Sequence, residues 1–104
     1  MSGYIKTGRD FNFYKQITVG WSTFGGGSSD GYTPDIIMSN GGSNIIILNE
    51  DPAAIVQVSF NGTTVHDQFS PTVLKGLCYS NRSISFIWFR LVSGGSAVVS
   101  VRSW

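Results

Sequence analysis

Short apolar runs rich in Ile, Val, Phe, Tyr, Trp and Thr alternate with turn sequences along most of the chain. The turn sequences are rich in Gly, Asn, Ser, Asp and Pro, which favour turns. No segment keeps the i, i+3, i+4, i+7 spacing of an amphipathic helix over a useful length. The pattern predicts an all-β fold, a compact antiparallel β-sandwich or barrel of about seven to nine short strands. The turn sequences lie at 25–31, 40–43, 50–52, 61–62, 70–71 and 93–96.

Two segments, 17–21 and 56–60, alternate strictly between apolar and polar or small residues. In the first segment Ile17, Val19 and Trp21 share one face. Successive side chains of a strand point to opposite faces, so each segment has one apolar and one polar face. This is the pattern of an antiparallel strand that covers a core on one side and meets solvent on the other.

Asn61 and Gly62 follow the second of these segments directly. Both residue types tolerate the positive φ angles that a two-residue type I′ turn requires. We therefore expect a β-hairpin in which Val58 faces Val65.

Residues 84–92 and 97–103 flank Ser93-Gly94-Gly95-Ser96, which predicts a second hairpin. In that hairpin Trp88 shares a face with Val99 and Val101, and Phe89 lies on the other face. Both faces are apolar over part of their length, whereas a hairpin exposed on one side alternates more strictly. Either both faces are covered within the domain, or another subunit covers one of them. We favour the subunit, because a domain of this size has room for two sheets and little more.

The chain has 104 residues, which indicates one β-domain over 1–104 with a possible N-terminal arm over 1–16. Aromatic residues at 11, 13 and 14 fit either such an arm or an ordinary edge strand. The first residues contain no apolar core of a signal peptide, so we expect synthesis in the host cytoplasm without export by the ordinary route.

Charged residues make up only 12% of the chain against 41% hydrophobic residues, so Ser, Thr, Asn and Gly must supply much of the polar surface. Charged residues are usually about 25% of a globular domain. A surface with so little charge is easily desolvated, which suits lasting contact with another protein. The net charge is +1 and the basic residues are scattered singly, which argues against a nucleic-acid partner. The apolar runs are too short to span a bilayer, so no membrane partner is expected.

The residues that carry chemistry are few. His66 is the only histidine, and its neighbour Asp67 points to the opposite face of a strand. In the expected hairpin Gln57, which is no catalytic partner, faces His66. Cys78 is the only cysteine and is expected to be a small buried residue. A metal site needs three or four converging ligands, which one His, one Cys and dispersed acids do not supply. We predict no enzyme, no catalytic residue, no metal and no cofactor.

The C-terminal third carries a recognisable pattern. The sequence Arg82-Ser83-Ile84-Ser85-Phe86-Ile87-Trp88-Phe89-Arg90 leads through Ser93-Gly94-Gly95 to Val99-Ser100-Val101-Arg102-Ser103-Trp104. It resembles small structural proteins of tailed bacteriophages, in which an aromatic-Arg strand and a Val-x-Val-x-x-Trp terminus close a compact β-domain. The resemblance covers roughly 56–104, and the N-terminal half adds no motif.

The resemblance implies a virion component, foremost a head decoration (cement) protein on the capsid surface that stabilises the head. Its implied partners are the major capsid protein and copies of itself, with a trimer favoured. Large aromatic residues make the best interface anchors. We expect two of five candidates at an interface and the others in the core. The candidates are Trp21, Phe24, Trp88, Phe89 and Trp104.

Two alternatives remain open at this point. A phage tail or fibre component shares every feature used so far. A carbohydrate-binding β-sandwich module could stack sugars on the aromatic residues that lie beside Asp30 in the segment 21–32.

Overall fold

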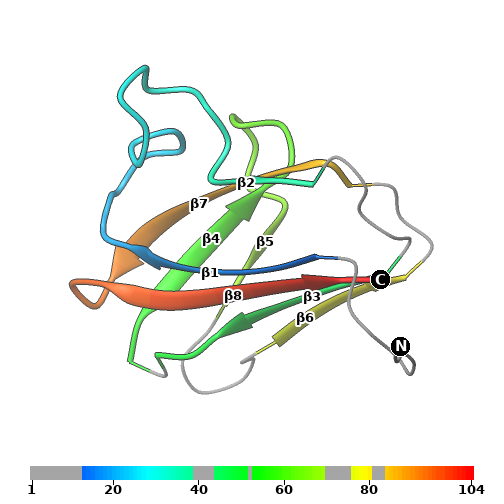
Figure 1. Ribbon diagram of the computed structural model, residues 1–104. Coiled ribbons are helices and arrows are strands. Elements are labelled where there is room, and N and C mark those ends of the chain that lie inside the picture. The colour runs from blue at the N-terminus through cyan, green and yellow to red at the C-terminus, as the bar shows by residue number, and fades with distance from the viewer. Residues whose placement is uncertain (1–12, 39–43, 52, 70–75, 81–83) are drawn as a thin grey trace.

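The chain folds as two antiparallel four-stranded sheets packed face to face, which confirms the all-β prediction (Figure 1). The computed structural model describes residues 13–38, 44–51, 53–69, 76–80 and 84–104. Within these ranges the two sheets form a sandwich and not a closed barrel. The strands are β1 (Phe13–Val19), β2 (Ile36–Ile37), β3 (Asn44–Asn49), β4 (Ile55–Ser59), β5 (Asp67–Gln68), β6 (Gly76–Ser80), β7 (Phe86–Ser93) and β8 (Ala97–Ser103).

The order of strands is β1-β8-β3-β6 in the first sheet and β2-β7-β4-β5 in the second. β8 therefore lies between β1 and β3, and β7 lies between β2 and β4. β1 is an edge strand that begins at Phe13. The last four residues of the possible arm 1–16 are thus part of the sheet, whereas 1–12 lie outside the described residues and that part of the arm stays a prediction.

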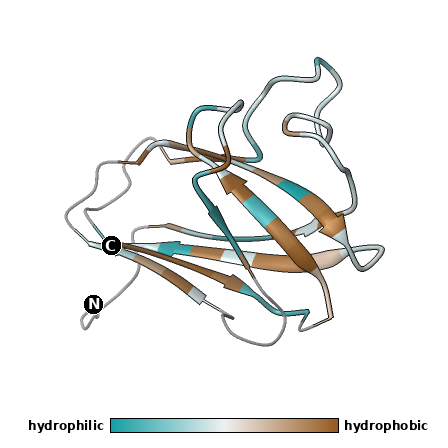
Figure 2. Ribbon diagram, turned by 180° about the vertical axis from the view of Figure 1, so that it is seen from behind, coloured by the Kyte–Doolittle hydropathy of each residue, from teal (hydrophilic) through white to brown (hydrophobic). Residues whose placement is uncertain are grey.

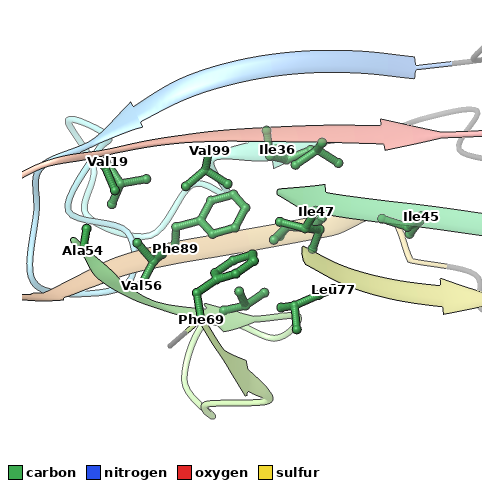
Figure 3. Close-up of a cluster of buried hydrophobic side chains, with 14 of the residues drawn as sticks. Val19, Ile36, Ile45, Ile47, Ala54, Val56, Phe69, Leu77, Phe89 and Val99 are labelled. Carbon is green, nitrogen blue, oxygen red and sulfur yellow. The ribbon is translucent and has the colours of Figure 1, made fainter. Parts of the chain in front are cut away.

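The core fills the space between the inner faces of the two sheets. Figure 3 shows the rings of Phe69 and Phe89 pointing from the second sheet toward Val99 and Ile47 of the first. Both rings are completely buried, so they are the largest apolar groups that folding removes from water. Other members of the core are Val19, Ile36, Met38, Ile45, Ala54, Val56, Val58, Leu77, Ile87, Ala97 and Val101.

The hairpin predicted from 84–103 was wrong, because β7 and β8 belong to different sheets. β8 pairs with β1 and β3, and the chain crosses from one sheet to the other at Gly94 and Gly95. Both glycines have positive φ, at 109° and 80°. A Cβ on Gly94 would lie 2.7 Å from the Cα of Ala54, so this corner packs closely against the second sheet.

This corner explains why 84–103 is apolar on two faces. In an arch between two sheets the inner side of one strand faces the inner side of the other. Phe89 of β7 and Val99 of β8 are both completely buried in the common core. Trp88 instead lies on the outside of the second sheet, so its predicted face with Val99 and Val101 was wrong. The inner sides of both strands are thus covered within the chain, whereas Phe86 and Trp88 remain on the outer face of the second sheet.

The register predicted for the Asn61-Gly62 hairpin was also wrong. Val58 pairs with Asp67 instead of Val65, and Gln57 pairs with Gln68. Gly62 does have the positive φ of a turn, at 85°. The loop is wider than two residues because the Asn61 side chain closes it: Oδ1 accepts the backbone N–H groups of residues 63 and 64 at 2.9 and 2.8 Å.

Cys78 is exposed, contrary to the prediction that it is buried. It pairs with Ile46 on the outer face of the first sheet, at the edge strand β6. The neighbouring position holds Leu77, which is 5% exposed and points into the core. The alternation of the strand therefore places the cysteine in solvent.

Candidate functional site

The outer face of the second sheet and the loop before β2 carry exposed apolar side chains. Tyr32 is 73% exposed, Ile37 52% and Phe86 46%. Ile37 and Phe86 are paired in register between β2 and β7. The ring of Phe86 lies 6.2 Å from that of Trp88, with 60° between the planes. We call Tyr32, Ile37, Phe86 and Trp88 the aromatic strip.

Trp88 holds the strip to the loop that precedes β2. Its indole Nε1–H donates a 2.9 Å hydrogen bond to the backbone carbonyl of Tyr32. The indole also packs against Gly62, where a Cβ would lie 3.1 Å from Trp88 Cε2. Trp88 is thus fixed on two sides while it joins the exposed residues of the strip.

The loop 20–35 seals the part of the β7 edge that the two-residue strand β2 does not reach. The indole N–H of Trp21 donates to the carbonyl of Phe89 at 2.8 Å, and the N–H of Phe89 donates to Asp35 Oδ2 at 2.7 Å. The N–H of Leu91 donates to the carbonyl of Trp21 at 2.8 Å. Two side chains and one backbone carbonyl of the loop thereby take the place of a strand, which satisfies backbone groups that would otherwise be open to another chain.

The glycine run in this loop has a steric cause. Gly25 is buried with φ at 85°, and a Cβ there would lie 2.1 Å from the carbonyl oxygen of Gly31. A Cβ on Gly27 would lie 2.6 Å from the ring of Trp21. The loop can fold back on itself and on the indole only because these positions carry no side chain.

Asp30 organises the tip of the same loop. Its carboxylate accepts the backbone N–H groups of Tyr32 and Thr33, both at 2.9 Å, and the hydroxyl of Ser28 at 2.8 Å. It also accepts the Thr33 hydroxyl. Hydrogen bonds from Thr33, then Tyr32 and Ser28, stabilise the charged form and hold the pKa of Asp30 well below its usual range. The exposed Tyr32 therefore belongs to a loop tip whose backbone is held in place by hydrogen bonds.

Asp35 behaves in the opposite way. Burial is the largest influence and raises the pKa of its carboxyl above 3.8, while the Phe89 N–H and the charge of Lys15 act to lower it. The folded state therefore binds more protons than the unfolded state as pH rises through this range, and stability falls with rising pH.

We expect Asp35→Asn to remove this pH dependence. Asn can still accept the Phe89 N–H through Oδ1, but it cannot ionise. The stability of the variant relative to the wild type should increase as pH rises from about 3.8 through the folded pKa of Asp35. Denaturant unfolding of both proteins at matched pH values measures this difference, and Asp30 contributes equally to both. A difference that stays constant with pH, or that shifts toward the wild type, would contradict the proposed cost of ionising Asp35.

Polar side chains cross the same face beside the aromatic strip. Figure 2 views this side, where the long strands are mostly hydrophobic and each is interrupted by a hydrophilic band. Arg90 Nε donates to Gln57 Oε1 at 2.7 Å, and Gln57 Nε2 donates to Gln68 Oε1 at 2.8 Å. The guanidinium of Arg90 lies over the ring of Phe24, 4.5 Å from its centre. We call Arg90, Gln57 and Gln68 the polar band.

The structure brings three of the five predicted interface residues together. Trp21, Phe24 and Trp88 lie around the outer side and the edge of β7, each half-buried. Phe89 is completely buried in the core of the chain. Trp104 is half-buried beside Asn44, with which it exchanges two backbone hydrogen bonds of 3.1 Å.

Sequence reasoning missed Ile37 and Phe86 as members of a surface, and it placed Tyr32 on one only as part of the possible sugar-binding segment 21–32. The alternation of Phe86 with Trp88 already placed both on one face, which was the available clue. Ile37 belongs to a strand too short to show alternation, and Tyr32 belongs to no strand.

His66 closes the loop after β4. Its Nδ1 accepts the backbone N–H of Phe60 at 3.0 Å, and its ring stacks on that of Phe60 at 5.3 Å. The part of the chain that the structure describes contains no group of three or more His, Cys, Asp or Glu side chains placed to bind a metal ion. Within the same ranges no helix is long and apolar enough to cross a membrane.

Comparison with protein-family models, curated proteins and solved structures gives no match to this chain.

Proposed function

We propose that the protein is a non-enzymatic virion structural protein of the capsid decoration type, which docks on the major capsid protein through the aromatic strip and stabilises the head. The observation that carries the proposal is the exposure of the paired residues Ile37 and Phe86, together with the exposed Tyr32 that Trp88 links to them. The core between the sheets is complete without them. Contiguous apolar side chains that the fold does not bury are typical of an interaction surface.

The strip also has the rigidity that docking favours. Phe86 and Trp88 stand on the long strand β7, and Trp88 is fixed by Tyr32 and Gly62. Ordered aromatic side chains lose little conformational entropy when they bind, so each can act as an anchor. On a symmetric capsid each contact can be modest, because linked copies bind with high avidity.

Self-association belongs to the same proposal, with a closed ring of three copies as the favoured assembly. The outer face of the first sheet supports it, because Ile46, Leu48 and Val98 are only half-buried there. Light scattering over a range of concentrations gives the solution mass. A stable trimer agrees with this assembly, whereas a monomer at every concentration would reject it and leave the docking strip unaffected.

The virion assignment is tested on purified particles of the virus that encodes the chain. Quantitative mass spectrometry of separated heads and tails should find the chain in heads, in a fixed ratio to the major capsid protein. Its absence from particles would overturn the proposal. Its presence in tails alone would favour the alternative of a tail or fibre component.

Within the strip, Phe86→Ser should weaken binding to heads that lack the protein at least about tenfold, which corresponds to about 1.4 kcal/mol. The matched control is Val92→Ser, because Val92 lies on the same strand and is 53% exposed, but lies outside the strip. A sedimentation assay with stripped heads measures both variants, and circular dichroism checks their fold. Equal binding by the two variants would mean that the strip is not the docking surface.

The carbohydrate-binding alternative has less geometric support. A sugar ring stacks on a flat, open aromatic face and bonds to polar groups around it. The planes of Phe86 and Trp88 are inclined by 60°, and the indole N–H of Trp88 is already bonded to Tyr32. A glycan array with the wild type and Phe86→Ser tests this alternative directly.

A further inference from the structure

We propose that Arg90 is a pre-oriented anchor for a carboxylate side chain on the protein that docks on the aromatic strip. This inference rests on the proposed docking function and adds the chemistry of the partner surface: an Asp or Glu flanked by apolar side chains.

The guanidinium of Arg90 is held in one orientation by two neighbours. Its plane lies over the ring of Phe24, 4.5 Å from the ring centre. Its Nε donates to Gln57 Oε1 at 2.7 Å. Stacking and one hydrogen bond fix the plane of the fork before any partner arrives, so binding loses little side-chain entropy.

The outer donors of the fork remain available. Among the described residues neither Nη atom of Arg90 has a hydrogen-bond partner. Gln68 lies at the other end of the polar band, and its Oε1 already accepts from Gln57, so its Nε2 is a further donor. The band thus presents donors outward, whereas its acceptors are used internally. A carboxylate accepts two parallel bonds from such a fork.

No carboxylate of the described chain neutralises this cation. Asp30 is saturated by its own loop, and Asp67 accepts the Tyr79 hydroxyl of the first sheet at 2.7 Å. The charge that acts on Asp35 is that of Lys15. Among the described residues, those beside Arg90 on the outer face of the second sheet are neutral, and none of them supplies an opposite charge.

The apolar surroundings make a protein carboxylate the fitting occupant. When the aromatic strip is covered, water leaves the neighbourhood of Arg90, and an ion pair there becomes stronger than on an open surface. A nucleic acid would need several phosphate contacts, whereas Arg90 is the one cation that the described residues place in the polar band. A carboxylate beside an apolar group can accept hydrogen bonds from the Arg90 guanidinium while the apolar group packs on the aromatic strip.

The test uses 3-phenylpropanoate, which joins a carboxylate to an apolar ring, and 3-phenylpropanamide as the uncharged control. NMR follows the Arg90 Nε–H and the side-chain amides of Gln57 and Gln68 in the full chain. We expect saturable shifts with the carboxylate at millimolar concentration, and shifts at least tenfold smaller with the amide at the same concentration. Equal shifts with both compounds would overturn the proposal.

Two variants test whether Arg90 itself binds the probe. Arg90→Gln should raise the dissociation constant of 3-phenylpropanoate at least tenfold. Gln57→Glu keeps Arg90 but places a carboxylate beside its fork, so it should block the probe while leaving the strip intact. Probe binding that is unchanged in either folded variant would overturn the anchor.

The outcome is separable from that of the docking function. If the probe binds as described but Phe86→Ser leaves head binding unchanged, the anchor stands and the docking proposal fails. If head binding depends on Phe86 but the probe does not distinguish carboxylate from amide, the docking proposal stands and the anchor fails.

Discussion

Replacing Phe89 by alanine is expected to destabilise the protein by about 3–5 kcal/mol. The ring is completely buried between the two sheets, so its removal leaves a cavity in the centre of the core. A loss of this size is a large part of the stability of a small domain, so much of the variant should be unfolded at 37 °C. Denaturant unfolding followed by circular dichroism measures the change.

Trp88→Ala is the matched comparison, because Trp88 is the next residue on β7 and the larger side chain. It lies on the outer face and is only half-buried, so its removal should cost about 1–2 kcal/mol. The order of the two effects tests the placement of the faces. If Trp88→Ala were the more damaging change, the assignment of Phe89 to the core and Trp88 to the surface would be reversed.

The second large effect is expected for Gly25→Ala, at about 2–4 kcal/mol. The new Cβ would lie 2.1 Å from the carbonyl oxygen of Gly31, and the backbone would keep a φ of 85° that alanine rarely adopts. The loop 20–35 must then open, which removes the cover from the edge of β7. Thermal unfolding gives the loss of stability, and the fluorescence of Trp21 reports the loop.

Gly31→Ala, at the other residue of this contact, separates the effect of backbone strain from that of a steric clash. Gly31 has a φ of 80°, but nothing lies within 4 Å of a Cβ built there. Its substitution should therefore cost about 1 kcal/mol, the penalty of the left-handed backbone alone. Equal losses of stability in Gly25→Ala and Gly31→Ala would show that the close approach of Gly25 to Gly31 does not determine the cost of the substitution.

Much of the fold followed from local sequence patterns. The segments 56–60, 84–92 and 97–103 correspond closely to β4, β7 and β8, because alternation and β-branched residues act within one strand. Residues 17–19 are the end of β1, and Gly20 and Trp21 lie beyond the strand. The absence of helical spacing correctly excluded helices from the described part of the chain.

The pairing of the strands could not be predicted from these local patterns, because a glycine pair permits either a hairpin or an arch. The decision at Gly94 and Gly95 depends on what the inner face of β8 meets, and that is β1 and β3, which are distant in sequence. The two apolar faces of 84–103 were the one local sign of an arch. They favour it because an arch turns both strands inward toward a common core.

The proposed docking surface was predictable only in part. The size of its side chain identified Trp88 of the strip, and likewise Phe24, which packs against Arg90 beside it, but size alone could not distinguish them from Phe89, which is core. The role of Trp21 depends on a hydrogen bond to a residue 68 positions away. No local pattern contains such a contact.

The central position of β8 has a consequence for the way the protein is made. β1 pairs with β8, so Phe13 must find Ser103, and β3 pairs with the same strand from its other side. Neither partner can complete its ladder while the ribosome is still adding residues before 97. During translation β1 therefore lacks its partner strand and β3 can pair only with β6, so the first sheet is completed only once the segment 97–103 is available. Such long-range pairing belongs to the slow-folding class of two-state domains, from milliseconds to seconds. A nascent chain stalled before residue 97 should accordingly be aggregation-prone and dependent on chaperones.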